Sequence, residues 1–162
     1  MNVNVFIREI VVHDTRDPGG DLGEYDIAFA AATDTDPAGV RVTPRWTNQV
    51  RKGESYEILE WLGPFSVQEG TQLTVSARGR EHDLIGSDPL LGGVAHLTRD
   101  EQWGVGRWLR TTNGRHFDFL FAVTRAEEGH AGRPTLTGQH NEVADAPGPR
   151  EVSSADYPAG PD

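Results

Sequence analysis

The chain of 162 residues carries 25 acidic and 15 basic side chains, a formal net charge of −10, and no cysteine. The lack of cysteine excludes disulfides and cysteine-ligated zinc or iron–sulfur sites, and the negative charge argues against nucleic acid as a partner, because phosphate binding requires clustered lysine and arginine. No stretch approaches the roughly 18 apolar residues of a membrane span, and no secretory signal is visible at the start, so we expect a cytoplasmic protein.

The first 126 residues contain short segments in which apolar and polar residues alternate, separated by turns rich in Gly, Pro, Asp and Asn. This period of two is typical of strands that bury one face. Eight strands are expected, near residues 3–12, 25–29, 40–42, 56–59, 73–77, 94–97, 108–112 and 117–123. The number and spacing of these strands predict an all-β protein, an antiparallel eight-stranded β-sandwich.

Three local patterns refine this prediction. Asn113-Gly114 lies between two β-rich segments and favours a hairpin, since both residues tolerate a positive φ. Thr98 and Glu101 have the spacing of a capping box, which indicates a helical turn that nearby glycines would stop. Residues 28–32 are alanine-rich and favourable for a helix, but the preceding alternation favours a strand.

From residue 127 the composition changes. Residues 127–162 hold seven acidic and two basic side chains, a net charge of −5, with many Pro and Gly residues and few large apolar ones. Such a segment buries too little surface to offset the entropy cost of ordering. We therefore expect a β-sandwich domain over residues 1–126 and a flexible acidic tail over 127–162, with folding of the tail on a partner as the alternative.

Two acidic segments are the candidate functional residues. Residues 13–26 hold five carboxylates and one cation, and residues 77–92 follow a strand and hold three more carboxylates beside Arg78 and Arg80. Calcium binds six to eight oxygen ligands supplied by flexible acidic loops. The alternative is that Asp, Pro and Gly are present because they form turns.

The order of these segments resembles the calcium- and lipid-binding sandwich of the C2 type. The resemblance covers residues 3–125 and rests on Glu24-Tyr25-Asp26 and on the run from Asp88 to Gly92, Asp-Pro-Leu-Leu-Gly. It implies that the two loops meet at one end of the sandwich. The calcium ligands it implies are Asp14, Asp17, Asp21, Asp26, Asp83 and Asp88.

The chain also departs from this family's pattern. Residues 77–80 stand where the family carries two alternating aspartates, and Pro89 stands where its last metal-binding aspartate is expected. Relatives that dock on lipid present apolar loop tips, for which residues 84–85 and 90–91 are candidates, although these residues fit a core position equally well. Many relatives keep the sandwich without the ions, which implies a metal-free interaction module as the alternative.

Two other types of site have to be weighed. His13-Asp14 and His82-Asp83 recur in the two loops, and two imidazoles with two carboxylates would suit zinc. The four tryptophans could form a carbohydrate-binding platform, although packing is the favoured role for most of them. These are Trp46, Trp61, Trp103 and Trp108.

The sequence contains no nucleophile elbow, phosphate-binding loop or His-Glu-x-x-His motif. We therefore expect a non-enzymatic β-sandwich binding module, with calcium as its cofactor, another protein as its partner and membrane contact as a further possibility. A metal-free structural or protein-interaction subunit of a larger assembly is the first alternative. A carbohydrate-binding domain is the second.

Overall fold

The computed structural model describes residues 1–16, 21–82, 86–128 and 143–145. Two short 3-10 helices, η1 (Arg99–Gly104) and η2 (Ala126–Glu128), accompany ten strands there. No helix in the described residues is long and apolar enough to cross a bilayer. The strands are β1 (Asn2–Val12), β2 (Leu22–Thr33), β3 (Asp36–Val42), β4 (Trp46–Arg51), β5 (Ser55–Ser66), β6 (Leu73–His82), β7 (Ser87–Leu97), β8 (Trp108–Arg110), β9 (Phe117–Arg125) and β10 (Val143–Asp145).

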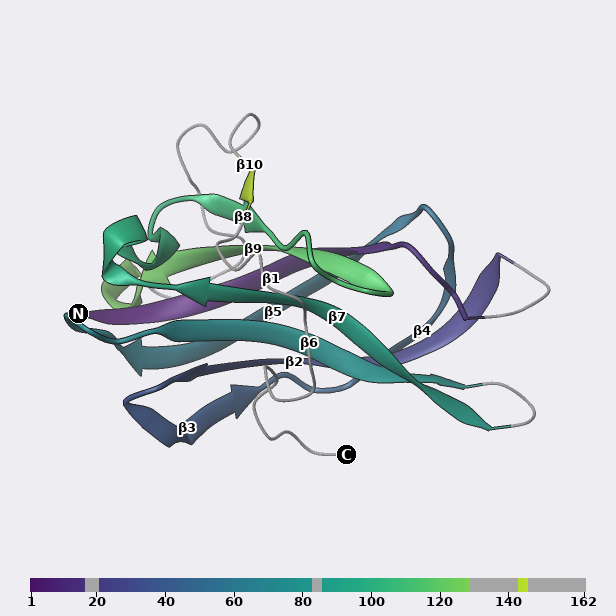
Figure 1. Ribbon diagram of the computed structural model, residues 1–162, viewed down its shortest axis with the longest axis horizontal. Coiled ribbons are helices and arrows are strands. Elements are labelled where there is room, and N and C mark those ends of the chain that lie inside the picture. The colour runs from purple at the N-terminus through teal and green to yellow at the C-terminus, as the bar shows by residue number, and fades with distance from the viewer. Residues whose placement is uncertain (17–20, 83–85, 129–142, 146–162) are drawn as a thin grey trace.

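The strands form two sheets whose strands run along the long axis of the molecule (Figure 1). In one sheet, β2 lies between β6 and the two strands β3 and β4, and β7 follows β6. In the other sheet, β1 lies between β5 and β9, and β8 and β10 follow β9. The sheets join where Gly92 of β7 lies opposite Phe117 of β9. The predicted all-β sandwich is confirmed, with ten strands in the described residues in place of eight. Pairing is mostly antiparallel, as predicted, but β10 pairs with β8 and β7 with β9 in parallel.

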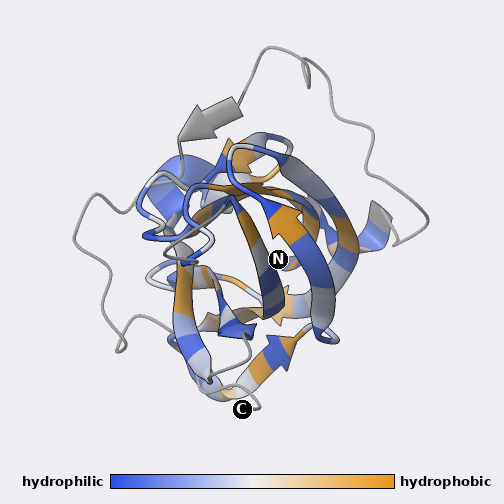
Figure 2. Ribbon diagram, turned by 90° about the vertical axis from the view of Figure 1, so that its right-hand side faces the viewer, coloured by the Kyte–Doolittle hydropathy of each residue, from blue (hydrophilic) through white to orange (hydrophobic). Residues whose placement is uncertain are grey.

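The predicted alternation places one face of each central strand in the core. Val3, Val5 and Ile7 of β1 are fully buried, and so are Leu73 and Val75 of β6. Figure 2 shows the same alternation as apolar and polar bands along the strands. Burial of these apolar side chains, at about 25 cal/mol per Å² of area removed from water, is the main force that holds the two sheets together.

Aromatic rings fill the space between the sheets. The ring of Phe119 in β9 lies 5.3 Å from that of Phe29 in β2, edge to face, and 5.4 Å from that of Phe121. The rings of Tyr25 and Phe117 form a further pair, with centroids 5.7 Å apart, near the start of β2. Each such pair contributes about 0.5–1.5 kcal/mol beyond the buried area, so the rings of β2 and β9 add to the packing between the layers.

A second apolar cluster lies on the outer face of the sheet that contains β1. Phe6 lies opposite Trp61 on one side and Ala122 on the other, and Ala122 lies opposite Trp108. The guanidinium of Arg8 lies 5.2 Å from the centroid of the Trp108 ring, a favourable cation–π geometry. These side chains thus form one row across the sheet: Trp61 of β5, Phe6 of β1, Ala122 of β9 and Trp108 of β8.

The tryptophans pack against the rest of the protein. Trp103 and Trp108 are 7% and 2% exposed, and Trp46 and Trp61 are half-buried against the two apolar clusters. The packing interpretation is confirmed for these residues. A carbohydrate-binding platform would require exposed aromatic rings, and these four tryptophans do not provide them.

The strands differ from expectation where they lack one buried face. β4 was not predicted, because it is an edge strand that pairs only with β2 and buries only Val50. β6 continues to His82 and β7 begins at Ser87, so much of the predicted second loop is strand. Residues 28–32 lie in β2, in agreement with the favoured strand.

The predicted capping box is present at η1. The backbone N–H and the hydroxyl of Thr98 both donate to Oε2 of Glu101. These bonds lower the pKa of the Glu101 carboxyl. The helix ends at Gly104, whose φ of +71° is open to glycine at little cost.

The hairpin predicted at Asn113-Gly114 is formed by β8 and β9, but its connection spans residues 111–116. The Asn113 side chain is the reason for the longer connection. Its amide oxygen accepts from the N–H of Val94 at 2.9 Å, and its amide nitrogen donates to the Val94 carbonyl at 3.0 Å. Asn113 therefore ties the connection to β7 instead of forming a two-residue turn.

The predicted tail, residues 127–162, lies largely outside the described residues. Within it, η2 ends at Glu128, and β10 pairs in parallel with β8 so that Val143 lies opposite Trp108. The boundary after residue 126 and the flexible character of the tail remain predictions.

Gly79 permits the close approach of β2 and β6. A Cβ at this position would lie 2.0 Å from the backbone oxygen of Asp26 and 2.6 Å from Cα of Ile27. Gly79→Ala should therefore lower the free energy of unfolding by more than about 2 kcal/mol, measured by urea titration. Gly86→Ala is the matched control, since its Cβ would meet nothing within 4 Å, and equal losses in the two variants would contradict this packing argument.

Candidate functional site

The loop end of the sandwich is the region where β1 ends, β2 begins, β6 ends and β7 begins, at the right of Figure 1. Pairing of β2 with β6 sets Tyr25 opposite Glu81 and Asp26 opposite Arg80. The two acidic segments therefore meet at one end, as predicted. His82 Nε2 lies 3.3 Å from Asp26 Oδ2, across 56 positions of sequence.

Four of the six predicted calcium ligands lie in the described residues, namely Asp14, Asp21, Asp26 and Asp88. Asp17 and Asp83 lie outside them. Asp26 lies in β2, within the predicted strand over residues 25–29, and Asp88 lies in β7, where a loop position was expected. Within residues 1–16, 21–82 and 86–128, no group of three or more His, Asp or Glu side chains is arranged to hold a metal ion.

Asp26 is neutralised by side chains of the protein itself. Arg45 Nη1 donates to Asp26 Oδ2 at 2.9 Å, and His82 Nε2 approaches the same oxygen at 3.3 Å. The Asp26 side chain is 13% exposed, so a carboxylate there requires a nearby positive group or several donors. Arg45 and His82 meet this requirement at Oδ2, whereas the buried Oδ1 has no hydrogen-bond partner within the described residues.

The other described aspartates stabilise turns or make long ion pairs. Asp14 Oδ1 accepts from the backbone N–H of Arg16 at 2.9 Å, the geometry of an Asx turn, and Arg16 has a positive φ of 59°. The backbone carbonyl of Asp21 accepts from the N–H of Lys52 at 2.9 Å. Asp88 Oδ2 lies 3.8 Å from Arg16 Nε. Asp14 thus stabilises a turn through its carboxylate, as the alternative from sequence implied.

The two loop histidines do not form the zinc site considered from sequence. His82 contacts Asp26, whereas His13 Nε2 lies 2.7 Å from Asp118 Oδ2 on β9. Asp83, the second carboxylate of that site, lies outside the described residues. Each imidazole of the pair is thus bound to a different aspartate.

Asp118 is a polar centre that sequence reasoning missed. Its side chain is 7% exposed, and its Oδ1 accepts from the Thr111 hydroxyl at 2.7 Å and from the N–H of Gly114 at 2.9 Å. His13 completes the set through Oδ2. The only sequence signal was an acidic residue between two phenylalanines, which by alternation indicated an outward position and no particular partner.

His116 connects β1, β7 and the start of β9. Its carbonyl accepts from the N–H groups of His13 and Asp14 at 2.8 and 3.1 Å, and its Nδ1 accepts from the N–H of Leu91 at 2.9 Å. The neutral ring therefore carries its proton on Nε2. Arg16 Nη1 lies 3.0 Å from that nitrogen, so this contact brings two donors together and is not a hydrogen bond.

The Tyr25 hydroxyl contacts the same backbone segment that His116 holds. It donates to the carbonyl of Asp14 and lies 3.3 Å from that of His116. Burial, with the nearby Asp14 and Glu81 carboxylates, raises the pKa of Tyr25 well above its ordinary value. The hydroxyl therefore remains a donor at any physiological pH.

The apolar residues considered as membrane tips are not all available for that role. Leu90 is fully buried in the core and Leu91 is half-buried in β7. Residues 84–85 lie outside the described residues. Leu22, 41% exposed at the start of β2, is the large apolar side chain that the described part of the loop end presents to solvent.

Comparisons with known proteins identify no family. No protein-family model matches the chain, and no curated protein matches its sequence. Among solved structures, the C2 domain designated A of plant extended synaptotagmin 1 aligns with a TM-score of 0.47 and 16% identity, over 76% of this chain and 92% of that one. Human GIVD cytosolic phospholipase A2 aligns with a TM-score of 0.43 and 16% identity, over 76% of this chain and 16% of that one. The chain thus bears a weak resemblance to C2-type sandwiches, and no ligand or residue role follows from it.

Protonation of His116 should destabilise the fold. Burial, reinforced by Arg16, lowers the pKa of His116 below its ordinary 6.5, so between the two pKa values the unfolded chain binds more protons than the folded one. This contribution to stability is present above the unfolded pKa and is lost as the pH falls below it.

We therefore expect the free energy of unfolding to fall between about pH 7 and pH 5, measured by urea titration. His116→Gln retains an acceptor for Leu91 but cannot titrate, and it should make this pH dependence shallower. His13→Gln is the comparison for an exposed imidazole. An unchanged slope in His116→Gln would contradict the assignment.

Proposed function

We propose that this chain is a non-enzymatic binding module that contacts another protein through the loop end and does so without calcium. The observation that carries the proposal is the double contact of Asp26 with Arg45 and His82. The non-enzymatic part rests on the lack of recognised catalytic motifs in the sequence.

The donor set of the described loop end does not fit a calcium ion. Calcium requires six to eight oxygens, whereas the nearest partners of Asp26 Oδ2 are the nitrogens of a guanidinium and an imidazole. A cation bound at Oδ2 would have to displace Arg45, because two positive charges cannot share one carboxylate oxygen without repulsion. Asp88 likewise has a guanidinium at 3.8 Å.

The exposed surface of the loop end carries both signs of charge. The side chains of Arg45, His82 and His13 are 41%, 43% and 43% exposed, and that of Asp88 is 48% exposed. Such a surface favours a partner with a complementary pattern of charges, which determines orientation and the rate of encounter. An anionic membrane is a poorer partner, because it repels a chain of net charge −10.

Calcium should leave thermal stability unchanged. A ligand at 100 times its Kd that binds only the folded state adds about 2.7 kcal/mol to stability, so calcium binding would be visible as a concentration-dependent rise of Tm over a chelator control. We expect no rise at millimolar calcium, and Asp26→Asn should lower Tm equally with and without the ion. A calcium-dependent rise in the wild type that Asp26→Asn abolishes would refute the proposal and restore the calcium hypothesis.

Reversal of charge at the loop end should weaken partner binding. Arg45→Glu places two carboxylates together at Asp26 and should weaken the complex by more than tenfold, about 1.4 kcal/mol. Arg99→Glu is the matched control, because it also breaks an arginine–carboxylate pair, with Glu69 at 2.7 Å, but on η1 at the other end of the sandwich.

The partner would be recovered by cross-linking in cells and its affinity for purified variants measured by interferometry. Circular dichroism would establish that both variants are folded. Equal affinities for the two variants would show that the partner does not bind at the loop end.

A further inference from the structure

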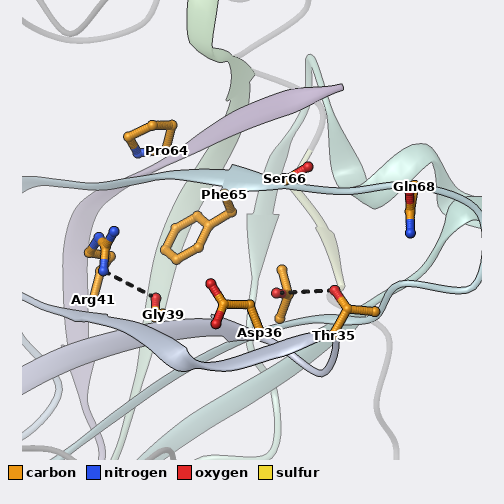
Figure 3. A pocket seen from close by; sticks show the side chains of 9 residues that line it. Thr35, Asp36, Gly39, Arg41, Pro64, Phe65, Ser66 and Gln68 are labelled. Atoms are coloured by element: carbon orange, nitrogen blue, oxygen red, sulfur yellow. Dashed lines mark hydrogen bonds between the residues drawn. The ribbon is translucent and has the colours of Figure 1, made fainter.

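A pocket of about 310 Å³ lies between β3 and β5, at the opposite end of the sandwich from the loop end. This placement follows from the pairing of β1 with β5, since the start of β1 lies beside the end of β5, with Asn2 opposite Ser66. Figure 3 shows the side chains that enclose the pocket from the two strands. The residues that matter for its chemistry are Thr33, Thr35, Asp36, Arg41, Phe65 and Gln68.

The pocket contains one negative and one positive group that are not paired with each other. Within the described residues, Asp36 forms no hydrogen bond or ion pair, and Arg41 forms a single long bond, from Nη1 to the carbonyl of Gly39 at 3.5 Å. Both residues are exposed. Each charged group is therefore free to bind a group of opposite charge from solution.

Gly39 makes the position of the Asp36 carboxylate possible. A Cβ at position 39 would lie 2.3 Å from Asp36 Oδ2, so any other residue would push this carboxylate away from its place above β3. The ring of Phe65 extends into the gap between the two strands (Figure 3) and is 5% exposed. Phe65 thus supplies an apolar wall between the acidic and the basic group.

We propose that this pocket binds a small zwitterion of the α-amino-acid type. Its ammonium group would pair with Asp36, its carboxylate with Arg41, and its side chain would lie against the exposed ring of Pro64. The hydroxyls of Thr33 and Thr35 and the amide of Gln68 are the neutral groups available to complete the ammonium's hydrogen bonds. None of these residues belongs to the loop end, so this proposal and the proposed function can fail independently.

The balance of charges selects a zwitterion over other small ligands. A simple anion would be attracted by Arg41 and repelled by Asp36, and a simple cation the reverse. A sugar would require an open aromatic face, and Phe65 offers almost none. Asp36 and Arg41 are exposed to solvent, so each of their ion pairs with the ligand adds little to the free energy of binding. We therefore expect a Kd in the millimolar range.

The test is a titration of the ¹⁵N-labelled full chain with the standard L-α-amino acids, followed by amide shifts in two-dimensional NMR spectra. We expect saturable shifts confined to β3 and to residues 63–68. The best ligand is then compared with its methyl ester, which lacks the carboxylate, and with its N-acetyl derivative, which lacks the ammonium. Each derivative should bind about two- to fivefold more weakly.

Two variants test which residue of the protein binds each charged group of the ligand. Asp36→Asn should remove the preference for the free amino acid over the N-acetyl derivative, and Arg41→Gln should remove the preference over the methyl ester. Arg99→Gln, an exposed arginine outside the pocket, should retain both preferences. The spectrum of each variant reports directly whether it is folded.

The proposal is overturned if no amino acid produces saturable shifts at β3 and residues 63–68, or if both derivatives bind as well as the parent. It is also overturned if a neutral sugar shifts the same amides more strongly than any amino acid.

Discussion

Alternate phenylalanines of β9 pack against β2 across the interface between the two sheets. Phe117, Phe119 and Phe121 are fully buried; the ring of Phe117 contacts that of Tyr25, and the ring of Phe119 contacts those of Phe29 and Phe121. β9 also pairs with β1, β8 and, at Gly92, β7. The remaining strands are thus positioned by one strand that is in contact with both layers. Its polar neighbours follow from the same placement, since Asp118 and His116 lie at its start.

The expectations from sequence were accurate where apolar side chains alternate along a strand. In β1, β6 and β9 the predicted alternating apolar residues are buried, although in β9 the residues between them are buried as well. The capping box at Thr98 forms as its spacing indicated. β4 escaped notice because five of its six side chains are not buried, so its pattern is that of a loop. The end of β6 and the start of β7 were assigned to a loop for the same reason. Their residues are mostly polar, so they lack the alternation of apolar and polar side chains that indicates a strand.

The location of the candidate site was predicted from sequence, whereas the side chains that pair with its acids in the described residues were not. Two acidic segments do meet, yet the sequence could not show which cations face which acids. Arg45 lies 19 positions from Asp26 and His82 lies 56 positions away, and only the pairing of strands brings them together. A count of carboxylates does not reveal which arginines and histidines of neighbouring strands pair with the same acids. The His13–Asp118 contact spans 105 positions, and no local motif announces it.

The adjacency of β1 and β9 has a consequence for the way the chain is made. The N-terminal strand pairs with β5 on one side and β9 on the other, with Val3 opposite Arg125. During synthesis the β9-facing edge of β1 has no partner until the ribosome has released the final strand of the sandwich. An open edge is a template for pairing with other chains, and distant pairings of this kind make folding slow, on the order of milliseconds to seconds. In the nascent chain this edge of β1 would therefore be open to aggregation or to chaperone binding. It would stay open from the synthesis of β1 until β9 pairs with it.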